Sequence, residues 1–294
     1  WGGPCGPRLR WKRGDGGTGP GLRSGVLAGG LHASWNSLVK TGQKKQSGML
    51  LLTLAHGFFG LCILPFVPVP QGAAWLWLTA SGLIHMFYQL FLGFAYERGD
   101  LSRVYPIARG AAPLIVLIIS LCFGIDSLRG MDLLGILVLG LGIVLMAHGV
   151  FRSGEDRRLI PLALGSAAAT AGYSLVDGLG ARVMGDALAY VAWLLIFSAV
   201  FYTPVILALR GRSVLPRGGG QIALGLLAGF ASFIAYAIVV WAMTVAPIAL
   251  VTALRESSIL FAMLLGWFFF KDTMGPTKIL AGLVIVAGVV LTRF

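Results

Sequence analysis

Residues 99–114 read G-D-L-S-R-V-Y-P-I-A-R-G-A-A-P-L and lead from a polar turn into an apolar segment that continues to Phe123. Arg109 therefore lies well inside a stretch with the composition of a membrane span. An arginine at the centre of a span costs about 2.5–3.5 kcal/mol on insertion scales, unless a partner or a water-filled cavity receives its charge. A second stretch of this kind, residues 246–270, carries Arg255 and Glu256 within an apolar run. The sequence thus predicts two buried charge sites, one in each half of the chain.

The composition is that of an integral membrane protein. Of the 294 residues, 57% are hydrophobic and 12% are charged, whereas about 25% of the residues of a soluble domain are charged. The formal net charge of +12 comes largely from basic residues between the apolar segments, where they act as topology signals and headgroup contacts. The basic face of a nucleic-acid-binding protein is missing, so nucleic acid is not expected as a partner. The cysteines and histidines form no metal-site or disulfide pattern, and no cofactor is expected.

The apolar segments have the length needed to span a bilayer, about 17–25 residues each. They follow a Gly-, Pro- and Arg-rich stretch, residues 1–23, which we interpret as a disordered or non-native tail. Because backbone polar groups must be satisfied inside the bilayer, the segments are expected to be helices. The predicted fold class is therefore all-α integral membrane, with ten transmembrane helices at residues 24–41, 48–67, 73–95, 102–123, 131–151, 159–181, 187–209, 221–244, 247–270 and 275–293.

The two halves of the chain resemble each other. A shift of 147 residues places Arg109 over Glu256 and preserves the order of the spans and charge sites. We therefore predict two five-helix repeats, at residues 24–151 and 159–294. Because five is odd, the repeats have opposite orientations in the membrane. Inverted repeats are typical of secondary transporters, whose substrate site lies near the midplane between the halves.

Several predicted spans carry polar residues three or four positions apart, which places them on one helical face. Lipid-facing surfaces hold such stripes only at high cost, so we expect these faces to point toward a shared polar cavity. Arg109 and Arg255 would attract an anionic group such as a carboxylate. Glu256 would balance an arginine or carry a coupled proton. The residues expected to orient the substrate by hydrogen bonds and stacking are Trp35, Asn36, Tyr88, Gln89, Tyr105 and Tyr173.

Other interpretations of the charged residues stay open. Arg109 and Glu256 could form a structural ion pair across the repeat axis instead of handling substrate. Arg255 and Glu256 are adjacent, so on a helix their side chains would point about 100° apart and would not both face one spot.

The same holds for three further features. Asp177 lies near a predicted helix end, where an interfacial, solvated aspartate fits as well as a functional one. His85 has polar neighbours and is a better site candidate than His56, which we interpret as a packing or interfacial residue. Gly225 and Gly229 have the G-x-x-x-G spacing that lets helices approach closely, and we expect them to serve packing.

Two segments resemble a known family. Residues 31–40, L-H-A-S-W-N-S-L-V-K, and 95–114, A-Y-E-R-G-D-L-S-R-V-Y-P-I-A-R-G-A-A-P-L, are similar to members of the drug/metabolite transporter superfamily in its EamA branch. Residues 241–262, W-A-M-T-V-A-P-I-A-L-V-T-A-L-R-E-S-S-I-L-F-A, resemble the ninth helix of that family. The resemblance implies a ten-helix carrier of two inverted repeats that works by alternating access around a central cavity.

The resemblance also implies a range of substrates: amino acids and their derivatives, nucleotide sugars, other small metabolites or drugs. Bacterial members are common, and the short loops fit a multi-pass protein of the inner membrane. The small multidrug branch carries protons on a glutamate in its first helix, and this chain has none there, which leaves Glu256 for such a role. The basic residues of the loops place both termini outside by the positive-inside rule, opposite to the family's usual cytoplasmic termini, whereas the five basic residues of the N-terminal tail favour the other orientation, so the orientation stays open.

We interpret the chain as a secondary transporter, an exporter or exchanger, of small polar metabolites such as amino acids or organic anions. It contains no G-x-x-x-x-G-K-[ST], G-x-S-x-G or H-E-x-x-H motif, so neither ATP hydrolysis nor another enzyme activity is expected. The alternatives are a membrane-embedded lipid-modifying enzyme and a multidrug efflux carrier. The expected partners are a small-molecule substrate and the lipid bilayer, while coupled protons and a homodimer are left open.

Overall fold

A computed structural model describes residues 45–98, 108–109, 111–128, 130–151, 158–216, 218–258 and 275–292. Over these residues the chain is helical, without strands. The α-helices are α2 (Lys45–Ile63), α3 (Ala74–Arg98), α5 (Ala112–Phe123), α6 (Gly130–Phe151), α7 (Leu159–Met184), α8 (Ala187–Arg210), α9 (Gly219–Val245), α10 (Ile248–Arg255) and α12 (Pro276–Leu291). Two short 3₁₀ helices, η1 (Leu64–Phe66) and η2 (Gly211–Val214), follow α2 and α8.

These helices coincide with predicted spans. The span predicted at 24–41 lies outside the described residues, and the spans at 102–123 and 247–270 are described in part. Within the described ranges, the helical stretches long and apolar enough to cross a membrane are Lys45–Phe66, Ala74–Arg98, Ala187–Val214 and Gly219–Val245. The protein is therefore a multi-pass membrane protein.

Local sequence explains where α7 and α8 meet. α7 continues to Met184 and ends at Gly185, whose φ of +77° belongs to the left-handed region that glycine adopts without strain. Asp186 then caps α8, because its Oδ1 accepts a hydrogen bond from the N–H of Ala189 at 2.9 Å. The tight α7–α8 connection makes the two helices neighbours and brings their polar faces together.

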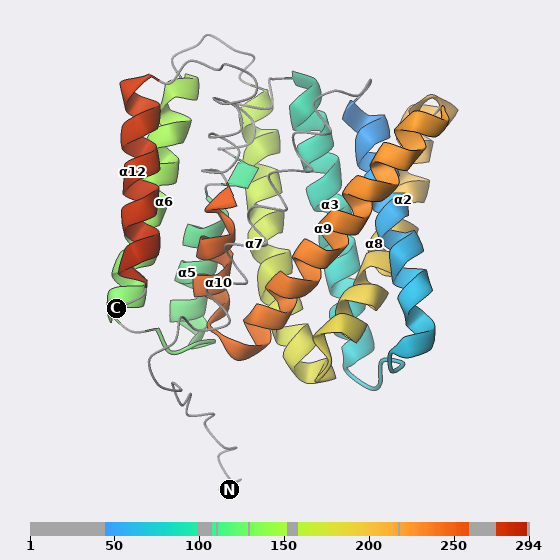
Figure 1. Cartoon of the computed structure of the whole chain (residues 1–294), viewed down its shortest axis with the longest axis horizontal. Coiled ribbons are helices and arrows are strands. Elements are labelled where there is room, and N and C mark those ends of the chain that lie inside the picture. Colours follow the sequence, from blue (N-terminus) through green and yellow to red (C-terminus); the bar gives the residue numbers. More distant parts are fainter. Residues whose placement is uncertain are drawn as a thin grey trace, which may run out of the picture.

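The helices form one bundle in which α3 and α7 occupy the middle (Figure 1). α6 packs against α12 at one edge of the bundle, and α2 packs against α8 and α9 at the other (Figure 1). α5 contacts α7 and α10 between the middle and the first edge. α7 therefore has neighbours on several sides, and it carries the polar residues from which the site is built.

The close contact predicted for Gly225 and Gly229 is confirmed. Both lie on α9, where it crosses α2. A Cβ atom added at Gly225 would overlap the side chain of Leu51, and one added at Gly229 would overlap Cβ of Ala55. Glycine at these two positions lets the α9 and α2 backbones approach closely.

Candidate functional site

Three charged side chains meet where α10 ends. Arg109 Nε lies 2.9 Å from Glu256 Oε2, and Arg255 Nε lies 3.4 Å from Glu256 Oε1. The three side chains are buried, since none is more than 4% exposed. Arg255 Nη2 has no hydrogen-bond partner among the described residues. Two guanidinium groups thus share one carboxylate in the interior of the bundle.

The expectation that Arg255 and Glu256 would not face the same spot is wrong. α10 ends at Arg255, and Glu256 lies in a tight turn in which its N–H donates to the carbonyl of Ala253 at 3.1 Å. The backbones diverge as expected, but both side chains are long enough for Arg255 Nε and Glu256 Oε1 to approach to 3.4 Å. The ion pair between Arg109 and Glu256, which the sequence left open, is formed.

Tyr173 on α7 links this charged cluster to a group of aromatic rings. Cζ of Arg255 lies 5.5 Å from the centroid of the Tyr173 ring, within the range of a cation–π contact. The ring of His85 stacks on Tyr173 with 4.2 Å between centroids. Tyr88 and Tyr236 meet Tyr173 at steeper angles, with centroid distances of 5.3 and 6.2 Å. The rings give the site a rigid, partly polar wall.

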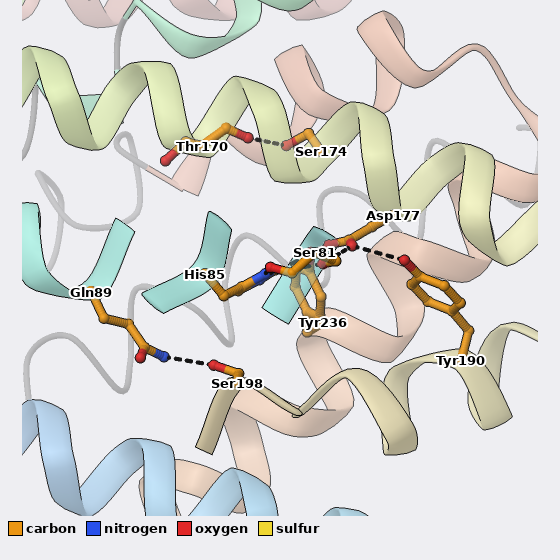
Figure 2. A network of polar contacts seen from close by, with 9 residues as sticks. All are labelled: Ser81, His85, Gln89, Thr170, Ser174, Asp177, Tyr190, Ser198 and Tyr236. Atoms are coloured by element: carbon orange, nitrogen blue, oxygen red, sulfur yellow. Dashed lines mark hydrogen bonds and ion pairs between the residues drawn. The ribbon is translucent and has the colours of Figure 1, made fainter. Parts of the chain in front are cut away.

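Asp177 is the centre of a second polar network (Figure 2). Its Oδ1 accepts hydrogen bonds from the hydroxyl of Ser81 and from that of Tyr190, the latter at 3.2 Å, and its Oδ2 accepts one from the hydroxyl of Tyr236. Nε2 of His85 lies 3.9 Å from Oδ2. The donors come from α3, α8 and α9, so the fully buried Asp177 carboxylate connects four helices.

The interfacial interpretation of Asp177 is therefore wrong, and this carboxylate is a site residue that our sequence-based selection missed. α7 extends beyond the predicted end at residue 181, and α8 and α9 cover the position. The signal in the sequence is the spacing of Thr170, Tyr173, Ser174 and Asp177 along one helical face. Two of these residues form hydrogen bonds within α7 itself: the hydroxyls of Thr170 and Ser174 donate to backbone carbonyls one turn earlier.

Comparison with known families indicates the class of protein to which the chain is related. Residues 157–294 match the model of the EamA-like transporter family. The match covers a little under half of the chain. The family is part of the drug/metabolite transporter superfamily, so the resemblance stated from the sequence is confirmed. Members of the family are transporters, and the matched residues include Tyr173, Asp177, Arg255 and Glu256.

A comparison with curated proteins finds no match for this EamA-like chain. Among solved structures, a crystal structure of a protein aligns with a TM-score of 0.71 at 20% sequence identity. The alignment covers 94% of this chain and 97% of that chain. At this identity the likeness shows the fold alone, and the two proteins share it over nearly their whole lengths.

The predicted site residues divide into three groups. Arg109, Tyr173, Arg255 and Glu256 are brought together, and Tyr88 contacts their aromatic side. Gln89, also on α3, is buried but points to α8, where its Nε2 donates to Ser198 Oγ at 3.1 Å (Figure 2). The remaining predicted residues, Trp35, Asn36 and Tyr105, lie outside the described residues.

The described side chains hold no group of three or more His, Cys, Asp or Glu that could bind a metal ion. What the site offers instead is a buried guanidinium pair with a single carboxylate at one end and a hydrogen-bonded carboxylate at the other. Tyr173 and His85 lie between them. These are the groups that ion pairing, hydrogen bonding and ring contacts with a charged polar molecule require.

Proposed function

We propose that this EamA-like protein is a secondary transporter, an exporter or exchanger, of small polar metabolites that carry an anionic group, such as amino acids or organic anions. One observation carries the proposal: Arg109 and Arg255 share the single carboxylate of Glu256, and Arg255 Nη2 has no hydrogen-bond partner in the described part of the chain. A substrate carboxylate at this position would accept hydrogen bonds from Arg255 Nη2 and pair with its charge, which is costly to bury unpaired inside a membrane.

Arginine suits this role because its planar guanidinium presents paired N–H donors that match a carboxylate. Glu256 pairs with Arg255 through Nε, which leaves Nη2 of the guanidinium for the substrate. The end of α10 at Arg255 supports the same interpretation, because helices interrupted near the midplane form the binding sites of many carriers. Alternating access would then expose this site to each side of the membrane in turn.

The finer architecture of ten helices in two inverted repeats, at residues 24–151 and 159–294, is part of the proposal. Under the shift of 147, α2 corresponds to α8, α3 to α9 and α6 to α12. α2 contacts α8, and α6 contacts α12, as equivalent elements near a two-fold axis do. The contact of α2 with α9 has its counterpart in the contact of α3 with α8. This paired packing supports a pseudo-two-fold relation between the halves.

The remaining predictions belong to the proposal as well. Tyr88 and Tyr173 would stack on the substrate, and Gln89 would reach it after releasing Ser198. Trp35, Asn36 and Tyr105 would complete the cavity. The protein would act in a bacterial inner membrane, without enzyme activity of its own, and a homodimer is a further prediction.

The test is flux in proteoliposomes that contain the full-length protein. Pools of radiolabelled amino acids, organic acids and phosphonates are tested for uptake and efflux, first for wild type and then for Arg255→Gln. Loss of a hydrogen bond to a charged group is worth about 1.5–3 kcal/mol, so we expect the variant to lose roughly 10–100-fold in apparent affinity. Membrane vesicles with lipid substrates, assayed for chemical turnover, test the enzyme alternative.

Arg210→Gln is the matched control, because Arg210 lies at the exposed end of α8 and pairs with Glu97. It removes one positive charge without touching the buried cluster, so flux should stay within about twofold of wild type, less than 0.5 kcal/mol. Equal flux in well-folded Arg255→Gln and wild type would make Arg255 structural. Absence of flux for every pool would overturn the proposed substrate class.

A further inference from the structure

Nε2 of His85 faces Asp177 and carries no proton in the neutral ring. Nδ1 of His85 lies 3.0 Å from the backbone carbonyl oxygen of Ser81 and 3.2 Å from its hydroxyl. A carbonyl oxygen only accepts hydrogen bonds, so this contact places the imidazole proton on Nδ1. In the neutral ring Nε2 then carries a lone pair, and this atom lies 3.9 Å from Oδ2 of Asp177.

Two proton acceptors thus face each other in a buried place. The side chain of His85 is 8% exposed and that of Asp177 is 0% exposed. Lone pairs on an imidazole nitrogen and a carboxylate oxygen repel at close range, and both are neutralised by one proton placed between them. The two atoms form a proton-binding pair in which one proton serves both groups, whichever atom holds it at a given moment.

The surroundings keep the Asp177 carboxylate in place when the proton is absent. Hydroxyl groups of Ser81 on α3, Tyr190 on α8 and Tyr236 on α9 all donate to it (Figure 2). α5 is also packed against α7 and brings no acidic or basic side chain. The charged group within electrostatic range is Arg255 of α10, which acts on both Asp177 and His85, and the titratable ring of His56 on α2 lies near His85.

The pair also touches the proposed substrate site. The ring of His85 stacks on that of Tyr173 with 4.2 Å between centroids, and the centroid of the Tyr173 ring lies 5.5 Å from Cζ of Arg255. When Nε2 takes a proton, the ring can close the gap of 3.9 Å to the roughly 2.8 Å of a charge-assisted hydrogen bond. A shift of the His85 ring moves the surface on which Tyr173 rests, and Tyr173 carries that change to Arg255.

We propose that His85 and Asp177 bind the single proton that drives transport, in place of the role that the sequence left open for Glu256. The proposal rests on the proposed transporter function. The proton binds from the acidic side, joins Nε2 of His85 to Oδ2 of Asp177, and leaves to water on the other side after the cavity has changed its access. No covalent bond other than N–H or O–H forms or breaks. Glu256 is already paired with Arg109 and Arg255, and it lies outside this proton-binding pair.

The first test needs no substrate. The full-length protein, labelled with ¹⁵N-histidine and placed in lipid nanodiscs, is titrated with acid while the ring nitrogen shifts are followed. The chain has four histidines, and His85→Gln identifies the signal. We expect a neutral ring with the proton on Nδ1, an Nε2 shift that reports the uptake of one proton by the pair, and a titration midpoint that shifts in Asp177→Asn. A ring with the proton on Nε2 throughout, or a midpoint that Asp177→Asn leaves in place, would overturn the proposal.

His56→Gln is the matched control, because His56 is also buried and lies near His85, but its Nε2 has no hydrogen-bond partner among the described residues and it is not one of the donors to Asp177. The His85 midpoint should stay within about 0.5 pH in this variant, less than 1 kcal/mol of coupling. If Asp177→Asn does not fold, Ser81→Ala serves instead, because it removes one hydroxyl donor to Asp177 and leaves the carboxyl in place. Sodium chloride in place of choline chloride at fixed pH should not move the signal; a sodium-dependent shift would replace the proton by a sodium ion.

The second test measures coupling. Proteoliposomes with a trapped pH dye receive a gradient of the pool that wild type transports, and lumenal pH is followed together with counterflow of the labelled pool. Asp177→Asn is expected to keep counterflow and to lose proton movement. If proton movement persists at the wild-type ratio, the pair does not carry the proton. Wild-type protein without counterflow would instead contradict the proposed function, and the histidine titration would still decide the proton site.

Discussion

Nε of Arg109 and Oε2 of Glu256 lie 2.9 Å apart, although 147 residues separate them in the chain. The same shift of 147 aligns the first half of the sequence with the second, so the two residues hold equivalent positions in the proposed repeats. Equivalent positions meet only near the axis that relates the repeats. In the proposed arrangement the pair therefore lies close to that axis, and Arg255 adds a second cation to it.

The shared carboxylate makes the cluster asymmetric, and this asymmetry predicts an order of stabilities. Glu256→Gln removes the carboxylate from two arginines, whereas Arg109→Gln leaves Glu256 paired with Arg255. Removal of one partner of a buried ion pair typically destabilises a protein by about 3–5 kcal/mol. We expect Glu256→Gln to lower the thermal unfolding midpoint in detergent by clearly more than Arg109→Gln does.

Arg109→Lys is the control for this comparison, because it keeps the charge and loses the guanidinium geometry. Its unfolding midpoint should fall between those of wild type and Arg109→Gln. A larger loss for Arg109→Gln than for Glu256→Gln would show that Arg255 does not neutralise Glu256.

The ring of Tyr173, rather than its hydroxyl, connects the charged cluster to His85. The stacking on His85 and the contact with Arg255 both involve the ring face. Tyr173→Phe keeps that face, and Tyr173→Leu removes it. Cation–π contacts are worth about 0.5–2 kcal/mol, so Tyr173→Leu should weaken the apparent affinity for the transported pool roughly 2–30-fold, while Tyr173→Phe stays near wild type. A large loss in Tyr173→Phe would assign the role to the hydroxyl instead.

The sequence was sufficient to predict the membrane class, the EamA resemblance, the spans that the described helices occupy and the two charge sites. These features depend on run length and composition, which are local. The contact of Arg109 with Glu256 could also be anticipated, because the repeat shift relates the two positions. Its geometry could not, because it depends on the end of α10 at Arg255 and on the turn that follows.

Asp177 shows why the second network escaped prediction. Whether a residue near a helix end is buried depends on which other helices cover it, and this is a property of the bundle. Tyr190 and Tyr236 reach Asp177 from α8 and α9, although 13 and 59 residues separate them from it in the chain. Gln89 is the opposite case: it lies on the predicted polar face, but its side chain donates a hydrogen bond to Ser198 on α8 and does not join the charged cluster.

Arg182 holds the connection between α9 and α10. Its Nε donates to the carbonyl of Met243 at 2.9 Å and its Nη2 to that of Ala246 at 3.1 Å, while Nη1 pairs with Asp126 at 2.9 Å. Asp126 in turn accepts a hydrogen bond from the N–H of Ile248, the first residue of α10, at 2.6 Å. Because this connection leads into the helix that ends at the charged cluster, its rigidity matters for the site.

We expect Arg182→Gln to raise hydrogen–deuterium exchange in residues 243–250 by roughly 10-fold or more, since three hydrogen bonds from one guanidinium are removed at once. Asp126→Asn should have a smaller effect, because the amide oxygen can still accept from Ile248. Exchange in α2, which Arg182 does not contact, is the internal reference. Unchanged protection of the connection in Arg182→Gln would show that packing alone holds it.

Gly229 provides a test of the close approach of α9 to α2. A Cβ at this position would overlap Cβ of Ala55, a rigid neighbour that cannot rotate away. Gly229→Ala must therefore push the two helices apart, and overpacking of this kind typically destabilises by about 1–3 kcal/mol. We expect a lower unfolding midpoint for Gly229→Ala in detergent and recovery in the double variant with Ala55→Gly, which moves the missing methyl group to the other helix.

Gly220→Ala on the same helix is the matched control, because a Cβ there meets nothing within 4 Å. It should leave the midpoint unchanged or slightly raised, since alanine favours a helix over glycine by about 0.5–1 kcal/mol. Recovery in the double variant is the decisive observation, because it requires that Gly229 and Ala55 face each other across one contact. A double variant less stable than both single variants would place the two residues in separate environments and would contradict the α2–α9 packing described here.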